Sequence, residues 1–288
     1  MAAPRKYLTA DTGFVAVTLG FCKKKSRLAT LLVLFLITPS TYAVEQQREI
    51  IATIPPLAGV VKMLIKRGEP ACLLPPGSDP HHFQLSPRQV EKLNRGRLLV
   101  RSSRDDHGWI TFSPQIPVID LWPNLDHAWL NPKMVGTILP LLAEKLTTTI
   151  PEKKNEIAVN LKQAKADIVA TRKTLETTLK HLKTDGIIMQ HPSWRGLFEA
   201  FGIPILLTLE SQQHGHEHGP RHLEKALSIL KQHPNALLVG DIRHSNRSLE
   251  WLTDHTDHKK ILYLDALGKC GDSWPALMQK NIDRIKRW

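Results

Sequence analysis

Short apolar runs alternate along the chain with longer segments in which apolar residues recur every three or four positions. The apolar runs are rich in Ile, Leu and Val and predict buried strands. They cover 50–54, 72–74, 98–100, 118–121, 187–190, 203–207, 236–239 and 261–264. The segments with helical spacing cover 57–66, a helix starting at Ser86 and Pro87, 194–201, 222–231, 245–252 and 274–285. Strands that alternate with helices indicate parallel sheets.

One segment near the middle of the chain, 152–182, contains neither Gly nor Pro. Its apolar residues are mostly three or four positions apart, which predicts one helix about 45 Å long. The same spacing also fits a coiled-coil seam or an ordinary amphipathic helix, but the position of the segment between two similar halves favours a connecting role. We therefore expect an α/β protein of two lobes, each a mainly parallel four-stranded sheet with flanking helices, joined by one long helix. The expected boundaries are a signal peptide at 1–43, a lobe at 44–148, the connecting helix at 149–183 and a second lobe at 184–288.

The N-terminal segment has the pattern of an export signal. A basic run at 23–27 precedes a short, mainly apolar run at 28–37, and small residues end this segment at Ala43. An apolar run of about ten residues is too short to cross about 30 Å of hydrocarbon as a helix. We therefore expect cleavage after Ala43 and a periplasmic location, with an uncleaved anchor that includes 14–21 as the alternative.

The composition excludes some classes of partner. The net charge is +12, and removal of 1–43 leaves 33 basic against 26 acidic residues, a net charge of +7. No stripe of Lys and Arg is interleaved with aromatic residues, so nucleic-acid binding is not expected. The chain is also expected to be a monomer. Of the three cysteines, Cys72 and Cys270 lie beyond 43 and could pair in an oxidising compartment; the sequence leaves this pairing open.

The unusual count is that of histidine, with 14 residues, because histidine is the commonest metal ligand. Four ligand-type residues follow predicted strands, two in each half of the chain: His81, His127, His191 and Asp265. Ligands of open α/β sheets bind beyond the carboxyl ends of the strands. The pattern therefore predicts one metal ion held between the lobes by these four residues.

The ligand types favour zinc. Three imidazoles and one carboxylate can fill the tetrahedral coordination of Zn²⁺ and leave no position for an activated water, so binding is favoured over hydrolysis. Mn²⁺ prefers more oxygen ligands but stays possible. A metal-dependent hydrolase with a zinc-activated water is the alternative from another class, and a surface adhesin on the same scaffold is a third.

Several motifs resemble those of the zinc- and manganese-binding solute-binding proteins of metal ABC importers. The segment LLPPGSDPH at 73–81 is similar to the family's LLPPGxDPH, and IATIPPL at 51–57 is similar to its opening strand. The segments DHAWLNP at 126–132, QHPSW at 190–194 and YLDALG at 263–268 are similar to three further family motifs. The resemblance covers the chain from about residue 50 to its end.

The resemblance implies a two-lobed protein that binds metal in the cleft between its lobes and delivers it to a membrane permease. It places the metal ligands at His81, His127, His191 and Asp265, and a histidine at 191 resembles the zinc branch of the family. Two motifs depart from the pattern, since Asn131 and Pro192 replace acidic residues. These changes affect the surroundings of the ligands, which tune metal affinity.

Two other histidine-containing segments could contribute. The loop HGHEHG at 214–219 could hold an auxiliary metal through His214, His216 and His218, or could simply be solvated. It is not the metalloprotease pattern, because the His216-Glu217 pair is followed at position 220 by proline instead of histidine, and Pro220 opposes the helix that this pattern needs. The group from Asp241 to His244 also follows a predicted strand, and we expect it to form a wall of the pocket.

Overall fold

The computed structural model describes residues 49–66, 70–80, 83–102, 106, 109, 114–210 and 219–288. These residues belong to one compact unit that begins at Gln46. The strands are β1 (Ile50–Ala52), β2 (Ala71–Cys72), β3 (Leu98–Arg101), β4 (Val118–Asp120), β5 (Ile187–Met189), β6 (Ile205–Thr208), β7 (Leu237–Asp241) and β8 (Ile261–Leu264). The α-helices are α1 (Pro55–Leu64), α2 (Pro87–Asn94), α3 (Pro132–Thr149), α4 (Lys154–Lys180), α5 (Arg195–Ala200), α6 (Pro220–Gln232), α7 (Arg247–His255) and α8 (Trp274–Lys286).

The strands form two four-stranded sheets, and every neighbouring pair within them is parallel. Their orders are β2-β1-β3-β4 and β6-β5-β7-β8. In both sheets the chain therefore places its strands in the same spatial order, relative to their order in the sequence. The two-lobed α/β architecture with parallel sheets and one long connecting helix is confirmed.

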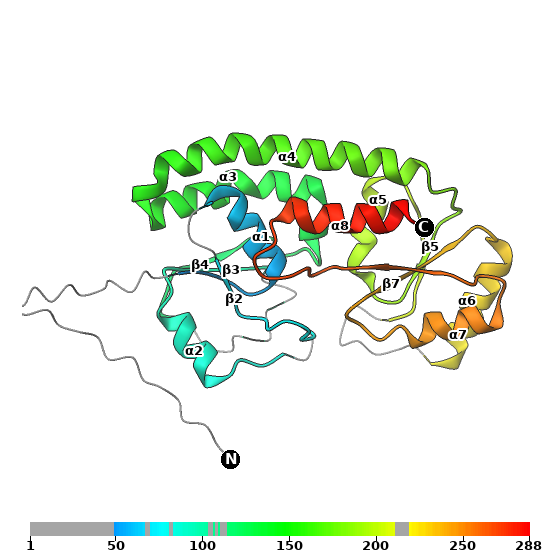
Figure 1. The fold of residues 1–288 in the computed structure, drawn as a ribbon. Coiled ribbons are helices and arrows are strands. Elements are labelled where there is room, and N and C mark those ends of the chain that lie inside the picture. The colour runs from blue at the N-terminus through cyan, green and yellow to red at the C-terminus, as the bar shows by residue number, and fades with distance from the viewer. Residues whose placement is uncertain are drawn as a thin grey trace, which may run out of the picture. The chain divides into compact units, whose positions relative to one another are not determined.

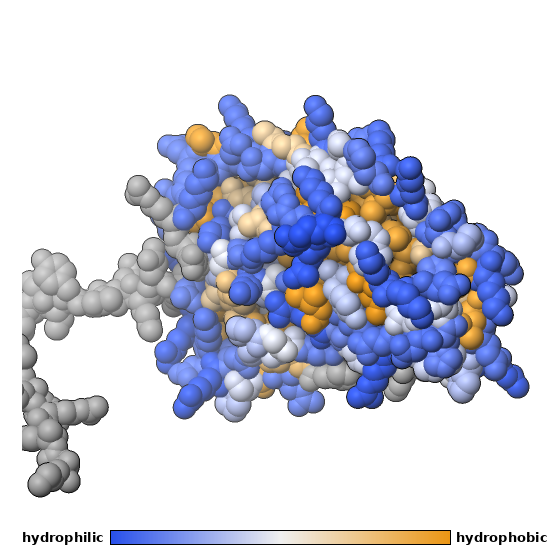
Figure 2. Space-filling view, turned by 45° about the vertical axis from the view of Figure 1, so that its right-hand side comes forward, coloured by the Kyte–Doolittle hydropathy of each residue, from blue (hydrophilic) through white to orange (hydrophobic). Residues whose placement is uncertain are grey.

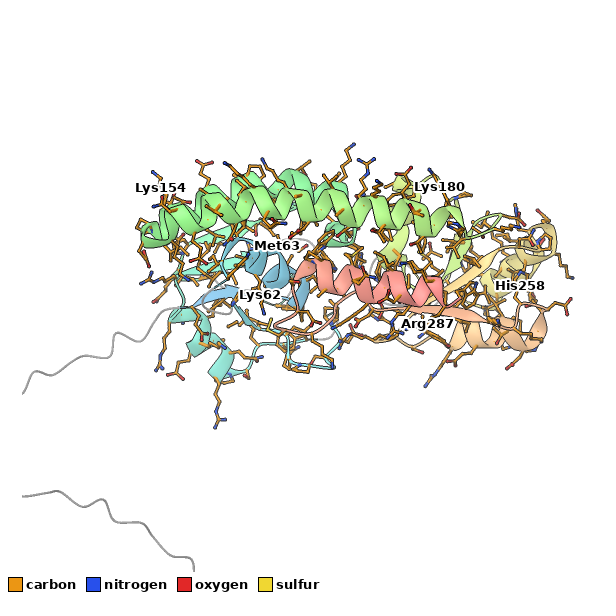
Figure 3. All side chains as sticks on the ribbon, turned by 45° about the horizontal axis from the view of Figure 1, so that its top comes forward. Lys62, Met63, Lys154, Lys180, His258 and Arg287 are labelled. Carbon is orange, nitrogen blue, oxygen red and sulfur yellow. A yellow bond between two sulfur atoms is a disulfide. The ribbon has the colours of Figure 1, made fainter. Side chains whose placement is uncertain are left out.

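The long helix α4 follows the first sheet in the sequence and precedes the second. Figure 1 shows it running over both halves, and Lys154 and Lys180 mark its two ends in Figure 3. It packs on α1, α3 and α8. The face turned to these helices buries Ile157, Ala164, Ile168, Leu175 and Leu179. One apolar core includes residues of both sheets and of this helix, so burial of apolar surface stabilises the two halves together.

Helix α3 has no counterpart among the predicted elements. It contains Pro140, which has no N–H to donate to the preceding turn and normally disfavours a helix interior. The start of the helix is nevertheless well specified, because the side chain of Asn131 accepts a hydrogen bond from Lys133 N at 2.9 Å and Pro132 occupies the first turn. This helix start follows the segment that carries His127.

Three contacts join segments of the first half to the region before and within α8. Cys72 and Cys270 form a disulfide with their Cα atoms 6.1 Å apart, which answers the question that the sequence left open. Gly59 of α1 lies so close to Trp274 that a Cβ atom there would be 2.9 Å from the Trp274 backbone nitrogen. The indole nitrogen of Trp274 donates to the carbonyl oxygen of Trp129 at 2.6 Å.

The surface in Figure 2 is mainly hydrophilic, with separate hydrophobic patches between charged side chains. Within the described ranges, no helix has the length and apolar character needed to cross a membrane. The proposed signal segment at 1–43 lies outside the described residues.

Candidate metal centre

Two of the predicted ligands, His127 and His191, lie next to each other. Their ring centroids are 5.2 Å apart and their planes are 77° from parallel. His127 follows the first sheet and His191 follows β5 of the second, so the two halves of the chain meet at this pair. His81 lies outside the described residues, as do the three histidines of the 214–218 loop.

The backbone at His127 is unusual. Its φ of 49° lies in the left-handed region, and no other non-glycine residue of the described chain has a positive φ. The residue directly precedes a 3-10 helix, Ala128–Leu130, and its carbonyl oxygen accepts a hydrogen bond from Leu130 N at 3.0 Å. A left-handed residue of this kind costs about 1–2 kcal/mol. The turn therefore fixes His127 beside Trp129, whose ring centroid is 5.2 Å from the imidazole.

His191 is almost fully buried, with 4% of its surface exposed. Its Nδ1 atom lies 3.3 Å from a carboxylate oxygen of Glu210, and Gln190 donates to the other oxygen at 2.7 Å. A carboxylate that accepts a hydrogen bond from the Nδ1–H group makes Nε2 the nitrogen with a lone pair for a metal. Glu210 therefore orients His191 in the way that outer carboxylates orient the histidine ligands of metal sites.

Glu210 remains ionised in this buried position. Burial alone raises the pKa of its carboxyl group, but hydrogen bonds from His191 and Gln190 and the charges of His191 and His244 outweigh it. The resulting pKa lies below the ordinary value for glutamate. A negative charge is thus maintained behind the His191 ring at neutral pH, which increases the basicity of that ring toward a cation.

Asp265, the expected carboxylate ligand, is already held by several donors. Its Oδ1 atom accepts from Arg243 Nε at 3.1 Å, from Leu267 N at 3.2 Å and from Gly268 N at 2.8 Å. The Arg243 guanidinium also donates to the carbonyl oxygen of Gly268. The carboxylate therefore has a counter-ion and fixes the turn after β8.

The neighbouring carboxylate Asp241 has a similar structural role. Its Oδ1 accepts from Arg243 N at 2.9 Å and its Oδ2 accepts from Ala266 N at 3.1 Å. Burial raises the pKa of this group. The side chain therefore joins the turn after β7 to the turn after β8.

His244 is in direct contact with one ring of the histidine pair. Its ring centroid is 4.9 Å from that of His191, and the two planes are within 17° of parallel. Its Nδ1 atom is 3.9 Å from Oδ2 of Asp79, a residue of the loop that follows β2. His244 and Asp79 thus also connect the two halves of the chain.

Glu210 and Asp79 were not selected by the sequence analysis as site residues, and His244 was expected only as part of a wall of the pocket. Glu210 follows the predicted strand at 203–207, so the strand-end rule that selected His191 also applied to it. Within the described ranges, no group of three or more His, Cys, Asp or Glu side chains converges closely enough to hold an ion. The described part of the site is thus an imidazole pair, with a third imidazole beside it.

The chain is similar to known metal-binding proteins over nearly all of its described length. The family model described as "Zinc-uptake complex component A periplasmic" matches residues 50–288. A Thermotoga maritima protein named "Putative metal-binding protein" is 29% identical, with 83% of this chain and 92% of the relative covered. The high-affinity zinc uptake system protein ZnuA of Haemophilus ducreyi is 25% identical, with 62% and 71% covered.

Solved structures share the fold. A crystal structure of ZnuA aligns with a TM-score of 0.70 at 19% identity, with 83% of this chain and 98% of that chain covered. The solute-binding protein FpvC of Pseudomonas aeruginosa in complex with Mn²⁺ aligns with a TM-score of 0.71 at 18% identity, with 83% and 96% covered.

Proposed function

The chain belongs to the family of periplasmic zinc-uptake components, which are non-enzymatic metal-binding components of ABC importers, and we propose that zinc is the ion it captures. Membership in a family of solute-binding proteins removes the support for the hydrolase alternative. The names of the relatives include zinc, iron and manganese proteins, so they leave the choice of metal open.

The observation that carries the proposal is the contact between His127 and His191, together with the carboxylate of Glu210 behind His191. Two imidazoles bound to one tetrahedral ion have their centroids about 5 Å apart, if each metal–nitrogen bond is about 2.0–2.1 Å. The observed 5.2 Å fits this spacing. Nitrogen ligands suit Zn²⁺ better than Mn²⁺.

We propose His81, His127 and His191 as the three histidine ligands of the ion, in a cleft between the two lobes. Asp265 is the fourth ligand that the resemblance to the family implies. The loop with His214, His216 and His218 remains a proposed auxiliary site of weaker affinity. Zn²⁺ is cargo in this proposal, and Mn²⁺ is the competing cargo.

The family consists of extracytoplasmic proteins, either periplasmic or anchored as lipoproteins. We propose that this chain is periplasmic after cleavage at Ala43, acts as a monomer and delivers its ion to the membrane permease of the importer. The basic run and the short apolar run at 23–37 support export. The lobe boundaries at 148 and 184 belong to the same proposal.

The test is titration of the metal-free protein with Zn²⁺ and with Mn²⁺. We expect one Zn²⁺ per chain at high affinity, weaker binding of Mn²⁺, and strong loss of zinc affinity in His81→Ala and in His191→Ala. His255→Ala is the matched control, because this exposed histidine stacks on Trp251. Wild-type zinc affinity in both ligand variants would overturn the proposed site.

A further inference from the structure

The segment between β8 and α8 returns to the first half of the chain and is held there by two contacts. We call residues 266–274, which end at the first residue of α8, the strap. Within it, Cys270 is bonded to Cys72, the last residue of β2. The carbonyl oxygen of Gly271 accepts a hydrogen bond from the side chain of Lys62 on α1 at 2.5 Å. The strap therefore joins the second sheet to an edge strand of the first by a covalent bond, with a charged hydrogen bond beside it.

Both ends of the strap also contact Trp129, which lies two residues after His127. The indole nitrogen of Trp129 donates to the carbonyl oxygen of Ala266 at 2.9 Å, and that of Trp274 donates to the carbonyl oxygen of Trp129 at 2.6 Å. All three residues are buried, so water does not compete for these hydrogen bonds. Because the strap holds the turn that carries His127, a displacement of the strap changes the position of His127 relative to His191.

The disulfide lies where a reductant can reach it in the folded protein. Cys270 is exposed and Cys72 is half-buried, and exposed disulfides belong to the more easily reduced class. A thiolate of a dithiol attacks the Sγ atom of Cys270, forms a mixed disulfide with it and releases Cys72 as a thiolate. The second thiol of the reductant then displaces Cys270. The dithiol is oxidised to a disulfide, and the protein gains two electrons and two protons as two thiols.

We propose that Cys72 and Cys270 form a thiol–disulfide exchange site that regulates how tightly the protein holds its ion. This inference rests on the proposed function, because it concerns the affinity for the same ion. The disulfide keeps the strap and the turn of His127 in place, and a dithiol reductant opens this link and weakens zinc binding. Coupling between two sites typically changes affinity by about 5–150-fold. By linkage, bound zinc shifts the disulfide toward its oxidised form by the same factor.

A zinc titration separates this role from a purely structural one. A disulfide that only restricts the unfolded chain stabilises the fold but leaves the zinc affinity of the folded protein unchanged. In the folded double variant Cys72→Ser/Cys270→Ser, we expect zinc affinity to fall by about 5–150-fold, measured by competition with a chromophoric chelator. Leu230→Ala is the matched control, because it removes buried apolar contacts from the separate cluster of the second lobe and does not involve the strap. It should bind zinc as the wild type does.

Reduction of the native protein is the second measurement. Metal-free wild type is incubated with dithiothreitol without denaturant, separated from it by gel filtration and titrated for thiols. We expect two thiols per chain and an unchanged circular dichroism spectrum.

Three results overturn the regulatory role of the disulfide. They are thiols that appear only after denaturant is added, loss of the native spectrum on reduction, and a zinc affinity of the double variant within about fivefold of the wild type. A wild-type protein that binds no zinc contradicts the proposed function itself, which separates the two failures.

Discussion

The indole nitrogen of Trp129 donates to the carbonyl oxygen of Ala266 at 2.9 Å. Trp129 is two residues after His127, and Ala266 directly follows Asp265. Both residues are buried, so the hydrogen bond joins the turn with the left-handed histidine to the turn after β8 without exposure to solvent. The position of His127 relative to the second half of the chain therefore depends on the tryptophan beside it.

Trp129→Phe should destabilise the metal-free protein, because the buried carbonyl group of Ala266 loses its donor. The expected loss in unfolding free energy is about 1–3 kcal/mol for the missing hydrogen bond. Urea unfolding followed by circular dichroism measures it. Trp251→Phe, at a tryptophan that stacks on an exposed histidine, should change stability much less.

The variant His127→Asn removes the imidazole ligand but is compatible with the left-handed turn at this position. Asparagine tolerates the left-handed conformation that residue 127 adopts, so the unfolding free energy should change by less than about 1 kcal/mol. Zinc affinity, measured by competition with a chromophoric chelator, should fall by more than about 100-fold because an imidazole is lost. Unchanged affinity in this variant would exclude His127 from the metal site.

Glu210→Gln tests the carboxylate behind His191. The variant keeps the size of the side chain but removes the charge that faces Nδ1. We expect zinc affinity to fall by about 10–100-fold while one ion per chain still binds. Glu199→Gln, at an exposed position of α5, is the control and should bind as the wild type does.

Removal of the disulfide between Cys72 and Cys270 should lower the free energy of unfolding substantially. Cys72 and Cys270 are 198 residues apart, and a cross-link that closes so long a loop restricts the unfolded chain strongly. The free energy of unfolding should fall by about 2–5 kcal/mol when both cysteines are changed to serine. A reducing agent should destabilise the wild type in the same way and leave the double variant unaffected; an equal effect on both proteins would count against this explanation.

The fold was well predicted because its buried parallel strands and its long helix each leave a clear pattern in the sequence. Parallel strands buried on both faces produce continuous apolar runs, and a 27-residue helix without Gly or Pro is easily recognised. Helix α3 was missed because Pro140 and Gly136 weaken its helical pattern, although Asn131 and Pro132 are typical of a helix start.

The candidate site was only partly predictable for a different reason. The strand-end rule finds residues that share one edge of a sheet, and it selected His127 and His191, which are in contact. It does not say which strand-end residues will pair. The contacts of Glu210 and His244 with His191 span 19 and 53 residues and depend on how the strands and turns pack. The ion pair of Arg243 with Asp265 likewise depends on how the turns after β7 and β8 pack together.

The most direct test of the central claim is an anomalous difference map from crystals grown with one equivalent of Zn²⁺, with data collected on both sides of the zinc absorption edge. We predict one dominant peak within about 2.0–2.2 Å of a ring nitrogen of His127 and of His191. A dominant peak elsewhere, such as the 214–218 loop, with none at this histidine pair would contradict the account.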